Sequence, residues 1–174
     1  MANLLVPLTK SPWSKGRWGK KENQDWYVGL VKTKNYLNER EGDRIALISN
    51  VYGENQEYEI DIYKRNIMDL GVSEECLICA KECFETSGQI NRAIELSKEL
   101  DLNLVLISSA FHYPRVMWLV GDENVEHLIF FGIPRPLELI TDMILSFVYP
   151  VIDVFGLNEV FTRLVIYKRR KFGY

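Results

Sequence analysis

The sequence predicts an α/β protein built as a three-layer sandwich, with a mostly parallel sheet of about five strands between helices. Short apolar runs alternate along the chain with segments of helical periodicity, as in successive β-α-β units. Several of these runs are continuously apolar, which is typical of strands that helices cover on both faces. The chain has 174 residues, the size of one domain. We therefore expect residues 1–174 to form a single domain with a Rossmann-like arrangement.

The predicted strands and helices alternate from the N-terminus. Strands are expected at residues 3–8, 44–49, 76–80, 103–108 and 126–131. Helices are expected between them, at residues 25–38, 56–70, 86–100 and 112–120. Gly71 follows the second helix, where a glycine commonly terminates helices. Residues Thr86 to Gln89 have the form of a capping box, which predicts that Thr86 caps the third helix.

A C-terminal helical segment is expected at residues 136–171, as one or two helices broken at Pro150 and Gly156. Glu138, Asp142 and Ser146 fall on one face of this segment, and apolar side chains fall on the other. This is the ordinary pattern of an amphipathic surface helix. We therefore expect its apolar face to pack on the core.

The composition is that of a globular protein, with 47% hydrophobic and 26% charged residues. A net charge of −3 excludes a chain whose whole surface coats nucleic acid. Residues 1–7 lack the basic segment of a signal peptide. The most apolar stretch, residues 139–157, is interrupted by Asp142, Pro150 and Asp153, and a membrane-spanning helix needs about 18 uninterrupted apolar residues. We predict a cytoplasmic protein without a transmembrane segment and without a nucleic-acid partner.

Three cysteines, Cys76, Cys79 and Cys83, lie in or just after the third predicted strand. An odd number does not suit a disulfide framework, and a structural zinc site needs four ligands. Two of the three belong to an apolar strand pattern, where cysteine behaves as a small buried hydrophobe. We predict reduced cysteines and no bound metal.

The predicted parallel sheet indicates where a ligand would bind. In such sheets, ligands bind beyond the carboxyl ends of the strands. Several small or polar residues follow these ends and are candidate ligand-binding residues: Thr9, Lys10, Ser49, Asn50, Thr86, Ser108 and Ser109. The alternative interpretation is that they are ordinary polar loop residues.

His112 and Arg115 form the sharpest local signal. Their i, i+3 spacing places both side chains on one face of a helix that opens directly after a buried strand. Backbone N–H groups at a helix start attract anions, arginine can grip a phosphate with two bonds, and histidine can donate to an anion or shuttle a proton. We expect a partly exposed pair that points into a pocket shared with Ser49 and the turn at residues 82–86. The alternative is a capping histidine and an arginine paired with a surface acid.

The segment Ser109-Ala-Phe-His-Tyr-Pro-Arg115, placed after an apolar strand, resembles the Thr/Ser-Ser-x-x-His-x-x-Arg motif of the SanA/YdcF-like family. Ser49 stands where that family has a Ser-Gly-Gly turn. Glu59 opens a helix that ends in Met68-Asp-Leu-Gly-Val72, and Thr86 stands where the family has a threonine before its third helix. The resemblance covers roughly residues 4–131. It implies a Rossmann-like fold, a polar pocket at the strand ends, and a role in envelope biogenesis or in binding nucleotide-like ligands.

The chain also departs from that family pattern. Asn50 and Val51 replace the paired glycines, and Gly88-Gln89 replaces the Glu-Asn that opens the third helix. Glu82 and Glu85 are the candidates for the carboxylate that follows the third strand in the family. These departures favour a protein that has kept the fold and lost the chemistry.

Two functional hypotheses follow from these residues. In the first, the site binds a phosphate-bearing ligand, either nucleotide-like or polyprenyl phosphate-like. Adenosylmethionine, a nucleotide-like molecule without a phosphate, is a candidate cofactor. His112 and Arg115 would hold the anion, and serines 49, 108 and 109 would orient it. Glu59 or Glu85 would bind a ribose hydroxyl or, with His112, act in an acid–base step if there is hydrolysis. In the second hypothesis, the protein is a non-catalytic binding or interaction protein.

Two basic segments carry further hypotheses. The loop from Lys10 to Lys21, both included, combines five basic residues with Trp13 and Trp18. It is interpreted as a lid over a phosphate-bearing ligand, as a solvated loop, or as a binder of single-stranded nucleic acid, which the net charge disfavours. The basic residues 168–171 indicate a peripheral contact with anionic lipid.

Overall fold

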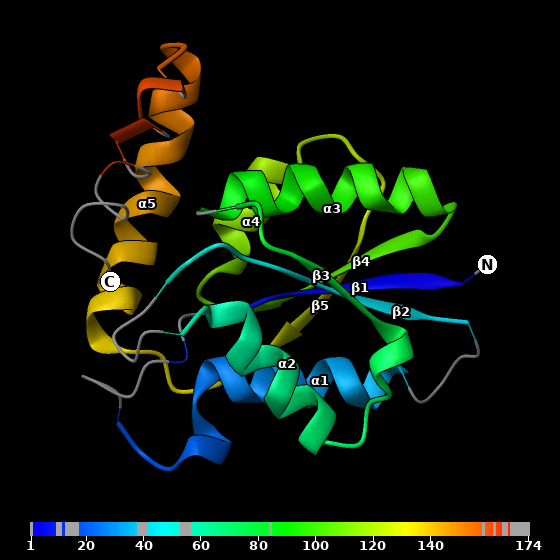
Figure 1. The fold of residues 1–174 in the computed structure, drawn as a ribbon. Helices are drawn as coiled ribbons and strands as arrows, with labels where there is room; N and C mark the ends of the chain where they lie inside the picture. Colours follow the sequence, from blue (N-terminus) through cyan, green and yellow to red (C-terminus); the bar gives the residue numbers. More distant parts are fainter. Residues whose placement is uncertain are drawn as a thin grey trace.

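The computed structural model describes residues 2–9, 12, 18–37, 42–52, 57–83, 85–157, 159–161, 163–164 and 167. Its five strands are β1 (Asn3–Leu8), β2 (Arg44–Ile48), β3 (Leu77–Ala80), β4 (Asn103–Ser109) and β5 (Glu126–Phe130). Its α-helices are α1 (Asp25–Leu37), α2 (Glu59–Asp69), α3 (Thr86–Leu100), α4 (Tyr113–Val120) and α5 (Pro136–Val154). Short 3-10 helices, η1 and η2, occupy Lys21–Asn23 and Glu74–Cys76. The elements alternate as predicted (Figure 1).

All five strands are parallel, in the order β3-β2-β1-β4-β5. The prediction of an α/β, Rossmann-like fold with a parallel sheet is therefore confirmed. The chain builds outward from β1 to β3 and then returns to place β4 on the other side of β1. The carboxyl ends of β1 and β4 thus form the switch point of the sheet, where ligands commonly bind in open α/β folds.

Helices cover both faces of the sheet, because successive side chains of each buried strand point to opposite sides. Leu5, Leu47 and Ile107 pack with α1 and α2 in one core cluster. Leu4, Ile48 and Leu106 pack with α3 and α4 in the other. Figure 1 shows these helix pairs on opposite faces of the sheet. The continuous apolar runs of the sequence are explained by this double coverage.

Two glycines stand where another residue would be strained or would clash, one at the end of α2 and one after β5. Gly71 has a φ of 92°, which favours glycine, and it ends α2 as the sequence predicts. Gly132, just after β5, lies against the start of α1, where a Cβ would lie 2.4 Å from the Cα of Asp25. The amide of Asp25 donates to the carbonyl of Ile133 at 3.2 Å. The first helix is therefore attached to the segment that leaves the last strand.

The start of α3 differs from the prediction. Glu85, not Thr86, is the N-cap residue, and its carboxylate accepts from the amides of Ser87 and Gly88. Gln89 does not complete a capping box, because its side-chain amide donates to the carbonyl of Ile48 at 2.7 Å. A glutamate can cap here because its extended backbone turns the carboxylate back onto the first turn of the helix. Thr86 is left with its hydroxyl available to another element.

The third strand is an edge strand, and this corrects the interpretation of the cysteines. Cys76 belongs to η2 rather than to a strand. Cys79 lies on β3 and is exposed, since β3 has a neighbour on only one side. All three thiols are free, and within the described residues no cluster of His, Cys, Asp or Glu could hold a metal ion.

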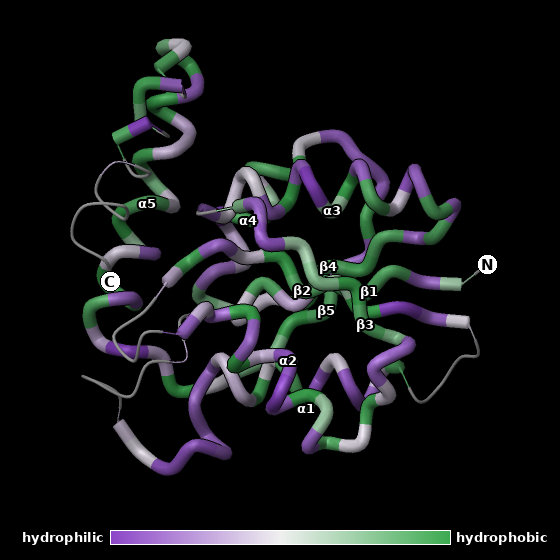
Figure 2. The backbone as a smooth tube through the Cα atoms, in the orientation of Figure 1, coloured by the Kyte–Doolittle hydropathy of each residue, from purple (hydrophilic) through white to green (hydrophobic). Residues whose placement is uncertain are grey.

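The predictions for α5 were wrong in two respects. Pro150 lies inside the helix and does not break it, and the helix ends only before Gly156, which has a positive φ. The face that carries Asp142 and Tyr149 is buried, whereas apolar side chains such as Phe147, 77% exposed, point away from the domain. Figure 2 shows the hydrophobic colouring along α5. The apolar face of this helix therefore does not pack on the core.

Within the described residues, no helix is long and apolar enough to cross a membrane. Residues 159–161, 163–164 and 167 are helical. The basic residues 168–171, which indicated a lipid contact, lie outside the described residues.

Candidate functional site

Buried polar side chains gather at the carboxyl edge of the sheet. Fourteen polar or charged residues are buried in the described part of the chain. Nine of them lie at this edge or on elements packed against it: Asp25, Ser49, Glu59, Glu85, Ser108, Ser109, His112, Arg115 and Asp142. Burying such groups is costly unless they are paired. Their concentration at one edge makes this the candidate site.

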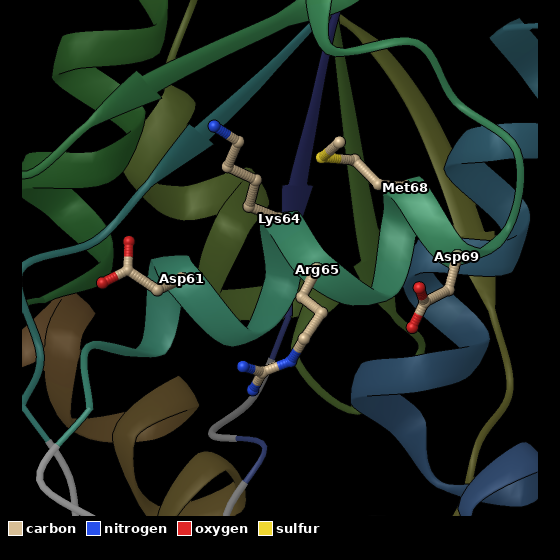
Figure 3. Close-up of a pocket in the computed structure, with 5 residues that line it drawn as sticks. All are labelled: Asp61, Lys64, Arg65, Met68 and Asp69. Carbon is tan, nitrogen blue, oxygen red and sulfur yellow. The ribbon is translucent and has the colours of Figure 1, made fainter.

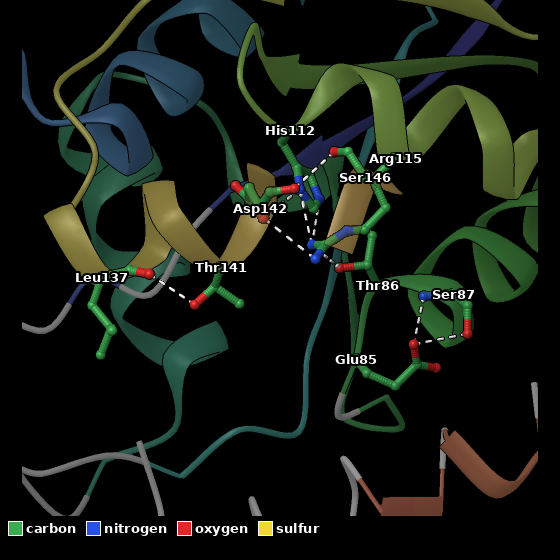
Figure 4. A network of polar contacts seen from close by, with 9 residues as sticks. All are labelled: Glu85, Thr86, Ser87, His112, Arg115, Leu137, Thr141, Asp142 and Ser146. Atoms are coloured by element: carbon green, nitrogen blue, oxygen red, sulfur yellow. Dashed lines mark hydrogen bonds and ion pairs between the residues drawn. The ribbon is translucent and has the colours of Figure 1, made fainter. Parts of the chain in front are cut away.

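His112 and Arg115 lie at the start of α4, directly beyond β4. An Arg115 Nη2 nitrogen lies 2.9 Å from His112 Nδ1, so the i, i+3 spacing places them on one face as predicted. The same nitrogen donates to the Thr86 hydroxyl of α3 at 3.1 Å (Figure 4). The guanidinium carbon lies 5.9 Å from the ring centroid of Tyr149. Arg115 is only 7% exposed, which corrects the expectation of a partly exposed arginine.

Asp142 of α5 completes this cluster. One of its carboxylate oxygens lies 3.3 Å from Arg115 Nη1 and 3.4 Å from His112 Nδ1. All three side chains are buried. The Ser146 hydroxyl, one turn further along α5, donates to the backbone carbonyl of Asp142 at 2.7 Å. The acid paired with Arg115 is therefore a buried carboxylate, not the surface acid of the alternative interpretation.

Both imidazole nitrogens of His112 lie near charged neighbours. Arg115 Nη2 lies 2.9 Å from Nδ1 and 3.4 Å from Nε2, and an oxygen of Asp142 lies 3.4 Å from Nδ1. A guanidinium can only donate hydrogen bonds and a carboxylate can only accept them, so these two neighbours favour opposite tautomers of the imidazole. Arg115 and Asp142 supply one positive and one negative charge to the cluster.

Glu85 and Glu59, the candidate bases, are both engaged by neighbours. Glu85 accepts from the Ser87 amide and hydroxyl, each at 2.7 Å, and from the Gly88 amide at 2.5 Å. It therefore stabilises the start of α3. Glu59 lies at the start of α2 and accepts from the Ser49 hydroxyl at 2.7 Å.

The structure divides the remaining predicted residues between two sides of the sheet. Ser49 bonds to Glu59 on the α2 side, whereas Thr86 bonds to Arg115 on the other side. Asn50 donates from its amide to the carbonyl of Cys83, joining the loops after β2 and β3. We expected one pocket shared by Arg115, Ser49 and the turn at residues 82–86. Of these expected neighbours, Thr86 bonds to Arg115, whereas Ser49 bonds to Glu59 on the other side of the sheet.

The hydroxyls at the switch point differ from these bonded groups. Leu8 pairs with Ser108 in the register of β1 and β4, so Thr9 and Ser109 are the next residues at the carboxyl ends. The hydroxyl oxygens of Thr9 and Ser109 are both buried and have no hydrogen-bond partner among the described residues. Ser108 is buried beside them. Lys10, the next candidate along the chain, lies outside the described residues, as does most of the loop predicted as a lid.

The nearby thiol of Cys83 is not activated. Burial, together with the charges of Glu82 and Glu85, raises its pKa to about 11. A nucleophilic cysteine needs a lowered pKa. Thiol catalysis at this edge is therefore not supported.

A shallow depression lies elsewhere, on the outside of α2. It is lined by Asp61, Lys64, Arg65, Met68 and Asp69 (Figure 3). Lys64 pairs with Glu74, and Arg65 pairs with Glu57 at 2.9 Å. These are surface ion pairs, which contribute little and mark no particular ligand. The carboxyl edge remains the candidate site.

Asp142 is the residue that sequence reasoning did not assign to the site. It was interpreted only as part of the polar face of a helix. A carboxylate within a strongly apolar helix is itself a signal, because such a charge is rarely left without a partner. The partner of Asp142 is Arg115 of the His112/Arg115 motif.

Searches of the chain against models of protein families, curated proteins and solved structures found no match. The resemblance to the SanA/YdcF-like family thus stays a prediction from sequence motifs.

Proposed function

We propose that the carboxyl edge of the sheet binds a phosphate-bearing small molecule in the cytoplasm, either nucleotide-like or polyprenyl phosphate-like. The observation that carries this proposal is the buried Arg115 at the start of α4, next to the switch point of a parallel sheet. Arginine binds phosphate through two parallel, charge-assisted bonds. The resemblance to the SanA/YdcF-like family, with its link to envelope biogenesis, supports the same ligand class.

The hydroxyls of Thr9 and Ser109 support a ligand that reaches the switch point. A buried hydroxyl without a partner costs about 1–3 kcal/mol. A ligand that supplies hydrogen-bond partners there would recover that free energy. A nucleotide has ribose hydroxyls that could serve. Because Thr9 lies against Gly29 of α1 and Arg115 lies on α4, its phosphate would extend across the carboxyl edge to reach Arg115. Adenosylmethionine has the same ribose and a carboxylate in place of the phosphate.

Asp142 occupies the place of the anion when no ligand is bound. Its carboxylate neutralises Arg115 at 3.3 Å, so an incoming phosphate must compete with it. This predicts an unusual result: Asp142→Asn, which keeps a hydrogen-bonding side chain and removes the competing charge, strengthens phosphate binding. The double variant Arg115→Gln/Asp142→Asn, which has no charge in the cluster, should lose it.

Calorimetric titration with nucleotides, adenosylmethionine and a short polyprenyl phosphate tests the proposal. We expect one phosphate ligand to bind, Asp142→Asn to bind it more tightly, and the double variant to bind it about 10- to 150-fold more weakly, as for the loss of a charge-assisted bond worth 1.5–3 kcal/mol. Arg163→Gln, at an exposed arginine, is the matched control and should bind normally. Circular dichroism checks the fold of each variant. Equal binding by the wild type and the double variant would refute the site.

The alternative is a non-catalytic interaction protein that keeps the fold. The observation that favours it is that Glu59, Glu85 and Asp142 all have partners within the protein. If no ligand of the panel binds or raises the thermal stability, this alternative is preferred, because a ligand at 100 times its Kd should add about 2.7 kcal/mol to stability.

A further inference from the structure

The outer face of α5 is apolar and exposed. We use this name for the side of α5 and its C-terminal end that points away from the domain, including Leu137, Met143, Phe147, Val151, Val154 and Phe155, each more than half exposed. The two acids in the first two turns, Glu138 and Asp142, lie against the domain instead. From Leu137 to Val151 the outer face therefore carries no charged side chain.

Such a face is not expected on a protein that is surrounded by water on all sides. Large contiguous apolar patches on soluble domains usually mark an interaction site. Leu157, Val160 and Leu164, which follow the end of α5, are also at least half exposed. Figure 1 shows α5 beside the domain, at the end of the sheet away from the N-terminus, where another surface could approach it.

The charge distribution along the chain indicates what that surface is. Residues 155–174 contain five basic residues and one acidic residue, a net charge of +4. The whole chain has a net charge of −3, so residues 1–154 carry −7. The apolar segment and the cationic segment are thus continuous in sequence, while the rest of the protein is acidic. Apolar and cationic residues together are typical of helices that bind anionic lipid surfaces.

We propose that the outer face of α5 binds the surface of an anionic lipid bilayer. The helix would lie in the plane of the interface, with Phe147, Val151 and Val154 at the acyl boundary. The inward face, held by Asp142, would keep the domain above the membrane. This proposal does not depend on the proposed ligand site.

Flotation with lipid vesicles tests it. We expect the protein to float with vesicles of phosphatidylcholine and phosphatidylglycerol, and much less with phosphatidylcholine alone. Phe147→Glu/Val154→Glu should weaken binding to the mixed vesicles by at least about tenfold, since each charge would have to enter the acyl boundary. Leu100→Glu is the matched control, because Leu100 is also apolar and exposed, at the far end of α3. It should bind like the wild type.

A second measurement covers the case in which the glutamate variants fail to fold. Phe147→Trp should gain fluorescence quenching by brominated phosphatidylglycerol, and Leu100→Trp should not. The proposal is overturned if the wild type does not float with mixed vesicles, or if Phe147→Glu/Val154→Glu floats as well as the wild type. It is also overturned if the wild type is a dimer that this variant converts to a monomer while vesicles bind neither, because a second copy then covers the face.

Discussion

Helices α3 and α5 are both amphipathic, but they present opposite faces to the domain. In α3, Ile90, Ala93 and Leu96 are buried between the helix and the sheet. In α5, Asp142 and Tyr149 are buried, and Ile144 is 56% exposed. The difference lies in what each helix covers. The face of the sheet under α3 is apolar, whereas α5 covers Arg115 and His112 at the carboxyl edge, which require a polar partner. An amphipathic pattern thus predicts two faces but not which of them turns inward.

The largest effect is expected from the buried charge of α5. Asp142→Ala should destabilise the protein by about 3–5 kcal/mol, because it leaves the buried Arg115 without its counter-ion. Glu159→Ala, which breaks the exposed pair with Arg163, should change stability by less than about 0.5 kcal/mol. Urea unfolding measures both. If Asp142→Ala is as stable as the wild type, the polar face of α5 does not hold the helix in place.

Matched isoleucines sharpen the comparison of the apolar faces. Ile90→Ala on α3 removes a fully buried side chain and should cost about 2–5 kcal/mol through lost burial and the cavity it leaves. Ile144→Ala on α5 removes an exposed one and should cost less than about 0.5 kcal/mol. Equal losses in urea unfolding would show that the outer face of α5 is covered within the protein.

The reactivity of single thiols compares the loop before α3, which carries the half-buried Cys83, with the exposed surface of α5. Burial and neighbouring acids raise the pKa of the Cys83 thiol to about 11. The double variant Cys76→Ser/Cys79→Ser leaves Cys83 as the only thiol to be measured. A raised pKa keeps the thiol protonated at neutral pH, so its alkylation by iodoacetamide should keep accelerating up to about pH 11. Thr141→Cys places a thiol on an exposed position of α5 in a chain without other cysteines, and its rate should level off near an ordinary pKa of about 8.5. At pH 8 we expect Cys83 to react about 100-fold more slowly.

The smallest effects concern the two helix starts. Glu85 accepts two amides at the start of α3, so Glu85→Ala should cost about 1 kcal/mol, the usual value of an N-cap. Ser73 precedes η2, is exposed and makes no side-chain capping bond. Ser73→Ala should therefore stay within about 0.5 kcal/mol of the wild type. A similar loss in both variants by thermal unfolding would contradict this assignment.

The sequence predicted the sheet well, because buried strands need continuous apolar runs and few other elements produce them. Each strand was located to within one residue at either end, and the bounds of α3 match those expected. The cap of α3 was missed because Thr86 fits a common pattern, while Glu85 reaches the same amides through a longer side chain. The exposure of Cys79 was missed because strand order, which makes β3 an edge, cannot be read from a strand's own residues.

For the candidate site, the sequence indicated Arg115 and His112 but not their partner. The i, i+3 spacing is local and could be read directly. Asp142 lies 27 residues beyond Arg115 on another helix, and only the packing of α5 across the carboxyl edge brings them together. The separation of Ser49 from Arg115 has the same cause, since residues at the ends of different strands share an edge without sharing a face.

The position of β1 at the centre of the sheet has a consequence for how the chain is made. β1 pairs with β4 along six residues, beginning with Asn3 opposite Asn103, and α1 is attached to the segment after β5 through the bond from Asp25 to Ile133. A ribosome delivers β1 first and β4 much later. Until β4 has been synthesised, one edge of β1 has no neighbouring strand. The contact of α1 with the segment after β5 can form only later still. Such distant pairing slows folding, so the nascent N-terminal half should need protection from association during synthesis.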